Sequence, residues 1–229
     1  MIDFHTHILP GMDDGSQSVP ESVSLLRLEA KQGVDLIMLT PHFYAEQNSP
    51  SDFLKRREQA WRKLRPYLWP ELPRMILGAE VQYFEGMSQV EDVFRLRLEG
   101  TPFLLVEMPF DRWTERMVEE VLDVHSHPDT RVVLAHIERY MSYQNPGVGE
   151  KLLSHGVLMQ SNITVFDNWR TRNRAISMMK NGQIHLLGSD CHNMRNRRPN
   201  WDNLPEKAWD LVQQSDAYRM LRRKYPVRC

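Results

Sequence analysis

The apolar residues of the chain gather in seven short runs, and a longer segment of mixed polarity separates each run from the next. The runs are mostly continuous rather than alternating, which is typical of strands buried on both faces of a parallel sheet. We predict strands over residues 2–4, 36–39, 75–77, 103–106, 132–135, 158–160 and 186–187.

The segments between these runs carry helix signals. Ser18 and Glu21 have the spacing of a capping box, and Gly33 is placed to end the helix that follows. Ser88 and Glu91 repeat the box further along the chain. We therefore predict helices between residues 18 and 33 and over 51–68, 90–98, 114–126, 148–154, 168–180 and 206–214.

Strands that alternate with helices indicate either an α/β barrel or an open doubly wound sheet. No low-complexity stretch or Gly/Ser linker interrupts the alternation. Because α/β barrels of up to about 250 residues form one domain, we predict a single domain over residues 1–229.

Composition and charge narrow the classes of function. The chain has 29 Lys and Arg against 30 Asp and Glu, a net charge of −1, which argues against a bulk nucleic-acid binder. No apolar run approaches the roughly 20 residues that span a bilayer, and the opening MIDFHTH lacks the features of a signal peptide. The cysteines, Cys191 and Cys229, are too few for a disulfide scaffold. We expect a cytoplasmic protein without membrane insertion.

Ionisable residues stand at the ends of six of the seven predicted strands. These residues are His5, His7, His42, Glu80, Glu107, His136, Asp190 and His192. In parallel α/β folds the carboxyl ends of the strands share one face, and active sites lie there. The other histidines are expected in a solvated loop, at a helix end or at the opposite face; they are His125, His127, His155 and His185.

Carboxylates gathered in this way would repel one another and raise each other's pKa unless cations neutralise them. Mixed nitrogen and oxygen ligands favour manganese, iron or zinc over magnesium or calcium. The candidates outnumber the ligands that one catalytic zinc takes, so we expect two or three divalent ions.

Several segments of the chain resemble those of one known superfamily. They are His5-Thr6-His7, Asp13-Asp14-Gly15, Thr40-Pro41-His42, Gly78-Ala79-Glu80, His136-Ile137-Glu138-Arg139-Tyr140 and Ser189-Asp190-Cys191-His192-Asn193. The chain is similar to the polymerase and histidinol phosphatase (PHP) superfamily, and within it to the bacterial CpsB/YwqE-type capsule-regulating protein-tyrosine phosphatases. The resemblance implies a distorted seven-stranded (β/α) barrel of PHP type, a trinuclear metal centre often filled by manganese, and dephosphorylation of a bacterial tyrosine autokinase.

Position by position, the resemblance implies three metal sites with a shared ligand. The sets are His5, His7, Glu80 and Asp190; Glu80, Glu107 and His136; and Asp14, His42 and His192. Asp13 directly precedes Asp14, so Asp13 stays open as an alternative to Asp14 in the third set. The resemblance assigns phosphate binding to Arg139 and Arg197, with Arg198 as an alternative to Arg197.

The ligand set predicts hydrolysis by a metal-activated hydroxide that attacks phosphorus, while arginines neutralise the phosphoryl oxygens. A rival pattern is C-x5-R from Cys191 to Arg197, as in cysteine-dependent tyrosine phosphatases. This segment contains no glycine, and the neighbouring Asp190 would raise the pKa of the thiol. We therefore reject a thiolate mechanism.

Two other functions stay open. A small-molecule phosphatase, such as a histidinol-phosphate phosphatase, would keep every metal ligand and differ only in the residues at the rim of the active site. A non-catalytic module would often lack ligands that this chain retains. Aromatic residues that follow the ligands form either an entrance suited to a phenyl ring or ordinary loop packing; they are Phe43, Tyr44, Phe84, Phe110, Trp113 and Tyr140.

Overall fold

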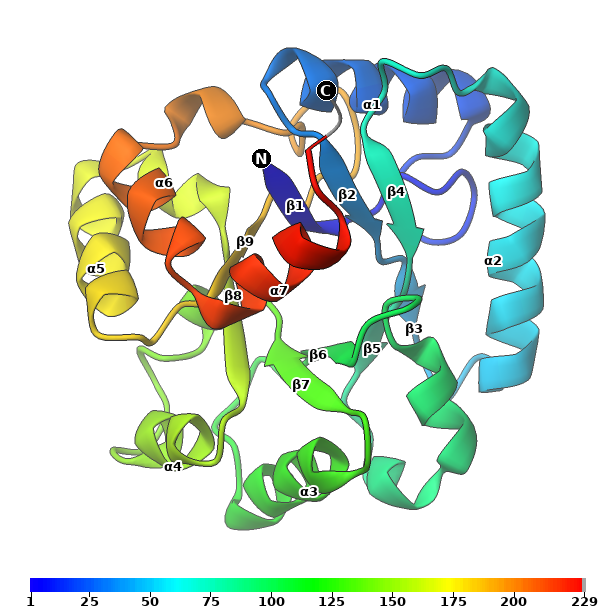
Figure 1. Ribbon diagram of the computed structural model, residues 1–229. Coiled ribbons are helices and arrows are strands. Elements are labelled where there is room, and N and C mark those ends of the chain that lie inside the picture. Colours follow the sequence, from blue (N-terminus) through cyan, green and yellow to red (C-terminus); the bar gives the residue numbers. More distant parts are fainter. Residues whose placement is uncertain (228–229) are drawn as a thin grey trace.

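Figure 1 shows the computed structural model, which describes residues 1–227. The strands run through the middle of the molecule and the longer helices surround them. All strand pairs are parallel, so the fold is α/β with a curled parallel sheet. Cys191 is a buried free thiol, and Cys229 lies outside the described residues.

All seven predicted strands are present, and the structure adds two short strands, β3 and β5, that were not predicted. The strands are β1 (Ile2–Thr6), β2 (Leu36–Leu39), β3 (His42–Phe43), β4 (Arg74–Leu77), β5 (Glu80–Gln82), β6 (Phe103–Glu107), β7 (Arg131–Leu134), β8 (Leu158–Asn162) and β9 (Leu186–Gly188). One sheet has the order β1-β2-β4 and the other β3-β5-β6-β7-β8-β9. A parallel bridge between Thr6 and Cys191 joins β1 to the segment after β9.

Short interruptions after β2 and after β4 position two candidate ligands. Between β2 and β3 the chain passes through Pro41, which has no N–H to donate to a ladder. Between β4 and β5, a Cβ on Gly78 would lie 2.1 Å from a methyl carbon of Leu98. His42 and Glu80 therefore begin short strands of their own instead of following a strand, and they pair with each other in register.

The α-helices agree closely with most of the predicted ranges. Within residues 1–227 they are α1 (Val19–Lys31), α2 (Pro50–Leu64), α3 (Glu115–Ser126), α4 (Val148–Ser154), α5 (Trp169–Lys180), α6 (Glu206–Gln213) and α7 (Asp216–Lys224). The Ser18 side chain accepts the N–H of Glu21 at 3.3 Å and caps α1. α2 ends before residue 68, because Pro66 cannot donate the next helical hydrogen bond, and η1 (Arg65–Tyr67) follows as a 3-10 turn.

The helix predicted over residues 90–98 is wrong. The segment forms two 3-10 turns, η2 (Met87–Gln89) and η3 (Glu91–Leu96), and Val90 between them is extended. The Glu120 carboxylate in α3 accepts the backbone N–H groups of Gly86 and Ser88, at 3.3 and 2.7 Å. A partner distant in sequence therefore holds this segment in place of a local capping box.

The two ends of the curled sheet differ in character. α7, which was not predicted, lies at the amino ends of the strands, where Arg222 pairs with Asp35 just before β2. Every residue of β1, β2 and β6 is buried, as expected for strands covered on both faces. The polar side chains gather at the carboxyl ends. No α-helix within residues 1–227 is both long and apolar enough to cross a bilayer.

Candidate metal centre

Glu80 lies at the centre of a polar cluster and is completely buried. Its Oε2 lies 3.1 Å from His5 Nε2, 3.3 Å from His7 Nε2 and 2.9 Å from His42 Nδ1. Its Oε1 lies 3.0 Å from His136 Nε2. One carboxylate on β5 thus contacts histidines from three other parts of the sheet.

The chain after β9 closes the cluster from another side. Asp190 Oδ1 lies 3.5 Å from His7 Nε2, and the ring of His192 stacks on that of His7 with centroids 3.9 Å apart. Glu107, at the end of β6, lies 3.4 Å from His136 Nε2. Residues that are distant in sequence therefore meet where the strand ends converge.

The two neighbouring aspartates of the DDG segment have different partners. Asp14 Oδ1 lies 3.3 Å from His192 Nε2 and 3.6 Å from His42 Nε2. The Asp13 side chain is buried, and its carboxylate bonds instead to His7 Nδ1 at 2.7 Å and to the backbone N–H of His42 at 2.8 Å. The geometry favours Asp14 over Asp13 as a ligand.

Three groups of side chains have donor atoms that all lie within 4.8 Å of one another, a spacing that suits metal binding. They are His7, Asp14, His42 and His192; His5, His7 and Asp190; and His42, Glu80 and Glu107. His136 contacts the third group through both of its carboxylates. All nine predicted ligands are thus brought together, although His7 and His42 each join two groups, which the implied sets did not foresee.

Several buried side-chain nitrogen and oxygen atoms that could bind a metal make no hydrogen bond within the part of the chain that the structure describes. They include Glu80 Oε2, His42 Nδ1 and His192 Nε2. An unsatisfied buried polar group costs about 1–3 kcal/mol, and coordination to a cation would remove that cost. The residues therefore fit divalent metal ions.

Charges within the cluster act strongly on one another. Burial lowers the pKa of His7, but the carboxylates of Asp13 and Glu80 outweigh this effect and raise the pKa well above its ordinary value. Burial also opposes charge on His136, yet hydrogen bonds to Glu107 and Glu80 raise its pKa to about 9. Without metal, imidazolium charge on His7 and His136 thus offsets part of the carboxylate charge, and metal binding would displace those protons.

Two predicted ligands lie on unusual backbone. His136 has φ 31° and Asp190 has φ 54°, a region that residues other than glycine rarely adopt. Close packing also explains why residue 15 is a glycine, because a Cβ there would lie 2.2 Å from the carbonyl oxygen of His7. The DDG segment therefore packs directly against the His5–His7 strand end.

β8 contributes two residues that were not predicted to belong to the site. Gln160 Oε1 accepts the N–H of His136 at 2.8 Å and lies 3.3 Å from His5 Nδ1. Asn162 Nδ2 donates to Asp190 Oδ2 at 2.9 Å. Polar residues two apart on a buried strand point to the same face, and this spacing was the available signal. β8, the one predicted strand that no predicted ligand follows, thus orients candidate ligands on neighbouring strands.

Two arginines border the cluster. Arg139 Nη2 donates to Asp190 Oδ2 at 2.7 Å, and Arg197 Nη2 donates to Asp190 Oδ1 at 2.9 Å. Arg197 also lies 3.7 Å from Asp14 Oδ2. The Arg198 side chain makes no hydrogen bond or ion pair with any described residue. Of the two alternatives, Arg197 is therefore the arginine at the cluster.

The family model for capsular polysaccharide synthesis proteins of the CpsB/CapC type matches residues 1–221. The chain belongs to the CpsB/CapC family. The tyrosine-protein phosphatase YwqE of Bacillus subtilis (strain 168) is 28% identical over 210 residues, which cover 86% of this chain and 79% of YwqE. The tyrosine-protein phosphatase CpsB of Streptococcus agalactiae serotype III is 28% identical over 213 residues, 87% of this chain and 86% of that protein.

Solved structures support the fold of this CpsB/CapC family member. One, from work on YwqE of Bacillus subtilis and CpsB of Streptococcus pneumoniae as metal-dependent tyrosine phosphatases, superposes with a TM-score of 0.73 at 23% identity. The superposition covers 97% of this chain and 92% of that chain. A putative histidinol phosphatase from Listeria monocytogenes superposes with a TM-score of 0.50 at 15% identity, over 83% and 94% of the chains.

The cysteine of the CpsB/CapC family chain is not placed to act as a nucleophile. Cys191 is fully buried, and its Sγ lies 3.7 Å from Glu29 Oε1. Burial, followed by the charges of Glu29 and Asp3, raises the pKa of the thiol well above its ordinary value. These observations agree with the rejection of a thiolate mechanism.

The six aromatic residues divide between packing and the rim. Phe43, Trp113 and Tyr140 are buried in the core, so an entrance function is wrong for these three. Phe84 is partly buried against the core. Tyr44 stacks on His42 with ring centroids 5.2 Å apart, and Phe110 is 60% exposed with its ring 5.9 Å from that of His136. Tyr44 and Phe110 therefore flank the cluster.

The remaining histidines lie outside the cluster, as predicted, but His125 is not in a loop. It belongs to α3, and its Nδ1 accepts the N–H of Val132 at 3.1 Å.

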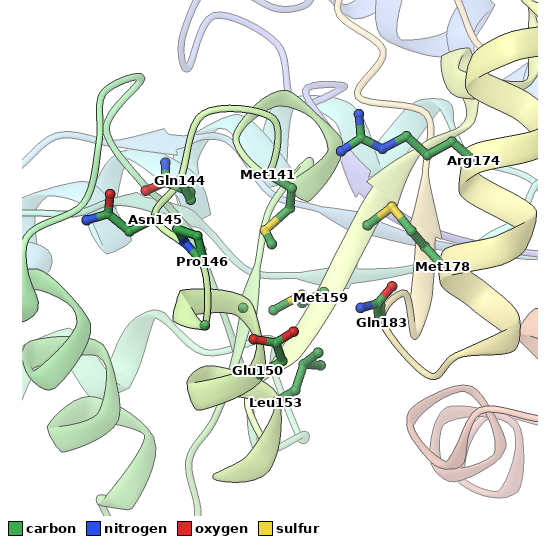
Figure 2. A pocket seen from close by; sticks show the side chains of 12 residues that line it. Met141, Gln144, Asn145, Pro146, Glu150, Leu153, Met159, Arg174, Met178 and Gln183 are labelled. Carbon is green, nitrogen blue, oxygen red and sulfur yellow. The ribbon is translucent and has the colours of Figure 1, made fainter.

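A separate cavity, shown in Figure 2, contains none of the predicted ligands. The methionines Met141, Met159 and Met178 line it, and Arg174 of α5 reaches its edge.

Proposed function

We propose that this member of the CpsB/CapC family is a metal-dependent protein-tyrosine phosphatase of capsule or exopolysaccharide synthesis. The observation that carries the proposal is the buried cluster around Glu80, in which several side-chain nitrogen and oxygen atoms lack hydrogen-bond partners, with Arg139 and Arg197 at its edge. Family membership and the names of the relatives support the same activity.

The proposed cofactors are three divalent ions, with manganese preferred and iron or zinc as alternatives. Their ligands would be His5, His7, Asp14, His42, Glu80, Glu107, His136, Asp190 and His192. Four ligand carboxylates against three divalent ions would leave a charge of about +2, because bound cations dominate the field of such a site. A cationic pocket of this kind suits a phosphate dianion, although the whole chain is nearly neutral.

The proposed frame for these ligands is one distorted seven-stranded barrel in a single domain. If β3 is counted as the continuation of β2, and β5 as that of β4, the strands number seven, and parallel pairing links each to the next. The bridge between Thr6 and Cys191 returns the last strand to the first. This circular order of contacts supports closure.

The arginines would bind the phosphoryl group. Bound divalent ions supply activated water at neutral pH and neutralise phosphate charge. The planar guanidinium forks of Arg139 and Arg197 match phosphoryl oxygens, where charge is spread in the transition state. Both forks already meet at Asp190, which holds them at the edge of the cluster.

Phe110 would recognise the phenyl ring of phosphotyrosine. It is 60% exposed although large and apolar, and its ring lies nearly parallel to His136 at an angle of 16°. A phenyl ring beside it would bury apolar surface on both partners. The substrate would be a phosphorylated bacterial tyrosine kinase. Because a kinase requires ATP, the reaction would take place in the cytoplasm.

The test is metal content by elemental analysis, coupled to turnover of a phosphotyrosine peptide before and after chelation. We expect chelation to abolish turnover, manganese to restore it, and histidinol phosphate to be the poorer substrate. Glu80→Gln should lose both metal and activity, whereas the exposed Glu71→Gln should keep both. Full activity of a metal-free preparation would refute the proposal.

A further inference from the structure

A positively charged cavity adjoins the candidate metal centre. Its volume is about 350 Å³. The charged residues that line it are Arg139, Asp167, Asp190, Arg195, Arg197 and Arg198. Arginines therefore outnumber carboxylates by two. Because Arg139, Asp190 and Arg197 belong to the cavity and also border the cluster, a ligand in this cavity would lie next to the reacting phosphate.

Both carboxylates of the cavity already have partners. Asp190 accepts hydrogen bonds from Arg139 and Arg197. Asp167 accepts from Asn200 Nδ2 at 2.8 Å and from Asn203 Nδ2 at 2.7 Å. Asp190 is paired with the two arginines at the cluster, and the asparagines hold the Asp167 carboxylate without an ion pair to Arg195 or Arg198.

Arg195 and Arg198 lie on a loop whose backbone is ordered. Neither side chain forms a hydrogen bond or ion pair with another residue in the range 1–227. The backbone of the loop is nevertheless fixed, because Asn193 Oδ1 accepts the N–H groups of Arg195, Asn196 and Arg197 at 3.0, 3.1 and 3.3 Å. The backbone of the loop is thus ordered before a ligand binds, and only the two arginine side chains would have to be immobilised.

We propose that this cavity binds a second anionic group of the substrate chain, close in sequence to the phosphotyrosine. The inference rests on the proposed function, since it assumes that a phosphotyrosine occupies the cluster. Arg195 and Arg198 would pair with a carboxylate or a phosphate. Asn200 Oδ1 is buried without a hydrogen bond and offers an acceptor for a peptide N–H, which favours a peptide over a free anion.

The experiment measures kcat/KM on matched phosphotyrosine peptides. Glutamate, phosphoserine, alanine or lysine is placed in turn at each of the three residues on either side of the phosphotyrosine, and the metal-loaded full chain is used. We expect one position at which glutamate raises kcat/KM about tenfold over alanine, as for a charge-assisted hydrogen bond. Comparison of the glutamate and phosphoserine peptides shows which anion the cavity prefers.

Variants locate the effect. The double variant Arg195→Gln/Arg198→Gln should lose the preference for glutamate, while turnover of phenyl phosphate, which has no flanking group, should change less than about twofold. Arg174→Gln, on an arginine of the separate cavity in Figure 2, is the matched control and should keep the preference.

Two results would overturn the inference without touching the proposed function. They are equal kcat/KM for all flanking residues, and a glutamate preference that survives in the double variant. If the metal-loaded protein hydrolysed none of the peptides, the proposed function would fail and the inference with it.

Discussion

The carboxylate of Asp13 lies 2.7 Å from Nδ1 of His7, while Nε2 of the same ring faces Glu80 and Asp190. Asp13 thus holds one nitrogen of the imidazole and leaves the other directed at the cluster. Carboxylates in this position fix the tautomer and orientation of a ligating histidine and increase its basicity.

We predict that Asp13→Ala weakens metal binding about 10- to 100-fold, the usual effect of removing such a partner. Metal affinity is measured by calorimetric titration of the chelated protein. Asp123→Ala, on an exposed aspartate of α3, is the control and should bind metal like the wild type. Unchanged affinity in Asp13→Ala, with circular dichroism showing a folded protein, would contradict the assignment.

The sequence predicts the strands, and the polar residues that gather at their ends, well because both depend on local pattern. Short apolar runs predict the strands, and polar residues at the ends of those runs, such as Glu107, project from the same face of the sheet. The resemblance implies that two metal sites share Glu80, but the local geometry that places Glu80 beside His42 was not predictable. It depends on short interruptions after β2 and β4, at Pro41 and Gly78, that bring His42 and Glu80 into register.

Contacts between distant segments account for the errors. The capping box at Ser88 was misleading because Glu120, from another element, accepts its N–H. Gln160 and Asn162 act on His136 and Asp190 across the sheet, so neither has a sequence neighbour that would suggest its role. The choice between Asp13 and Asp14 likewise depends on which side of His7 each carboxylate approaches, a feature absent from spacing.

The buried thiol provides a second test. Cys191→Ser should retain most phosphatase activity, because the raised pKa keeps the Cys191 thiol protonated and the group lies against Glu29 rather than the cluster. Activity on a phosphotyrosine peptide is compared with that of the chelated wild type, which should be inactive. The reverse pattern, an inactive serine variant and a chelator-resistant wild type, would restore the thiolate mechanism.

Phe110→Ala should raise KM for a phosphotyrosine peptide by about 2- to 13-fold with little change in kcat, because an aromatic pair contributes about 0.5–1.5 kcal/mol. Hydrolysis of a phosphoserine peptide, which has no ring, should be unaffected. Tyr67→Ala is the matched control, since Tyr67 is similarly exposed, at 59%, and lies on η1. Equal KM values for Phe110→Ala and the wild type would rule out ring recognition at this position.

At the opposite end of the sheet, Asp35 should make stability depend on pH. Both oxygens of Asp35 bond to the Arg222 guanidinium at 2.6 Å, and Oδ1 also accepts from the amino group of Met1 at 2.6 Å. Burial alone would raise the pKa of Asp35, but the bonds to Arg222 and the amino terminus outweigh it and lower the pKa below 3.8.

The contribution of Asp35 to stability is therefore present above its unfolded pKa and is lost as the pH falls through the lower, folded value. Because the side chain is partly exposed, solvent screening limits this contribution to about 1 kcal/mol. Asp35→Asn should thus lower the free energy of unfolding in urea by about this amount at pH 7 and 4.5, and the difference should shrink at pH 3. In a double-mutant cycle with Arg222→Gln the two losses should not add, since each removes the same ion pair. A difference between Asp35→Asn and the wild type that is independent of pH would instead assign the effect to packing of α7 against β2.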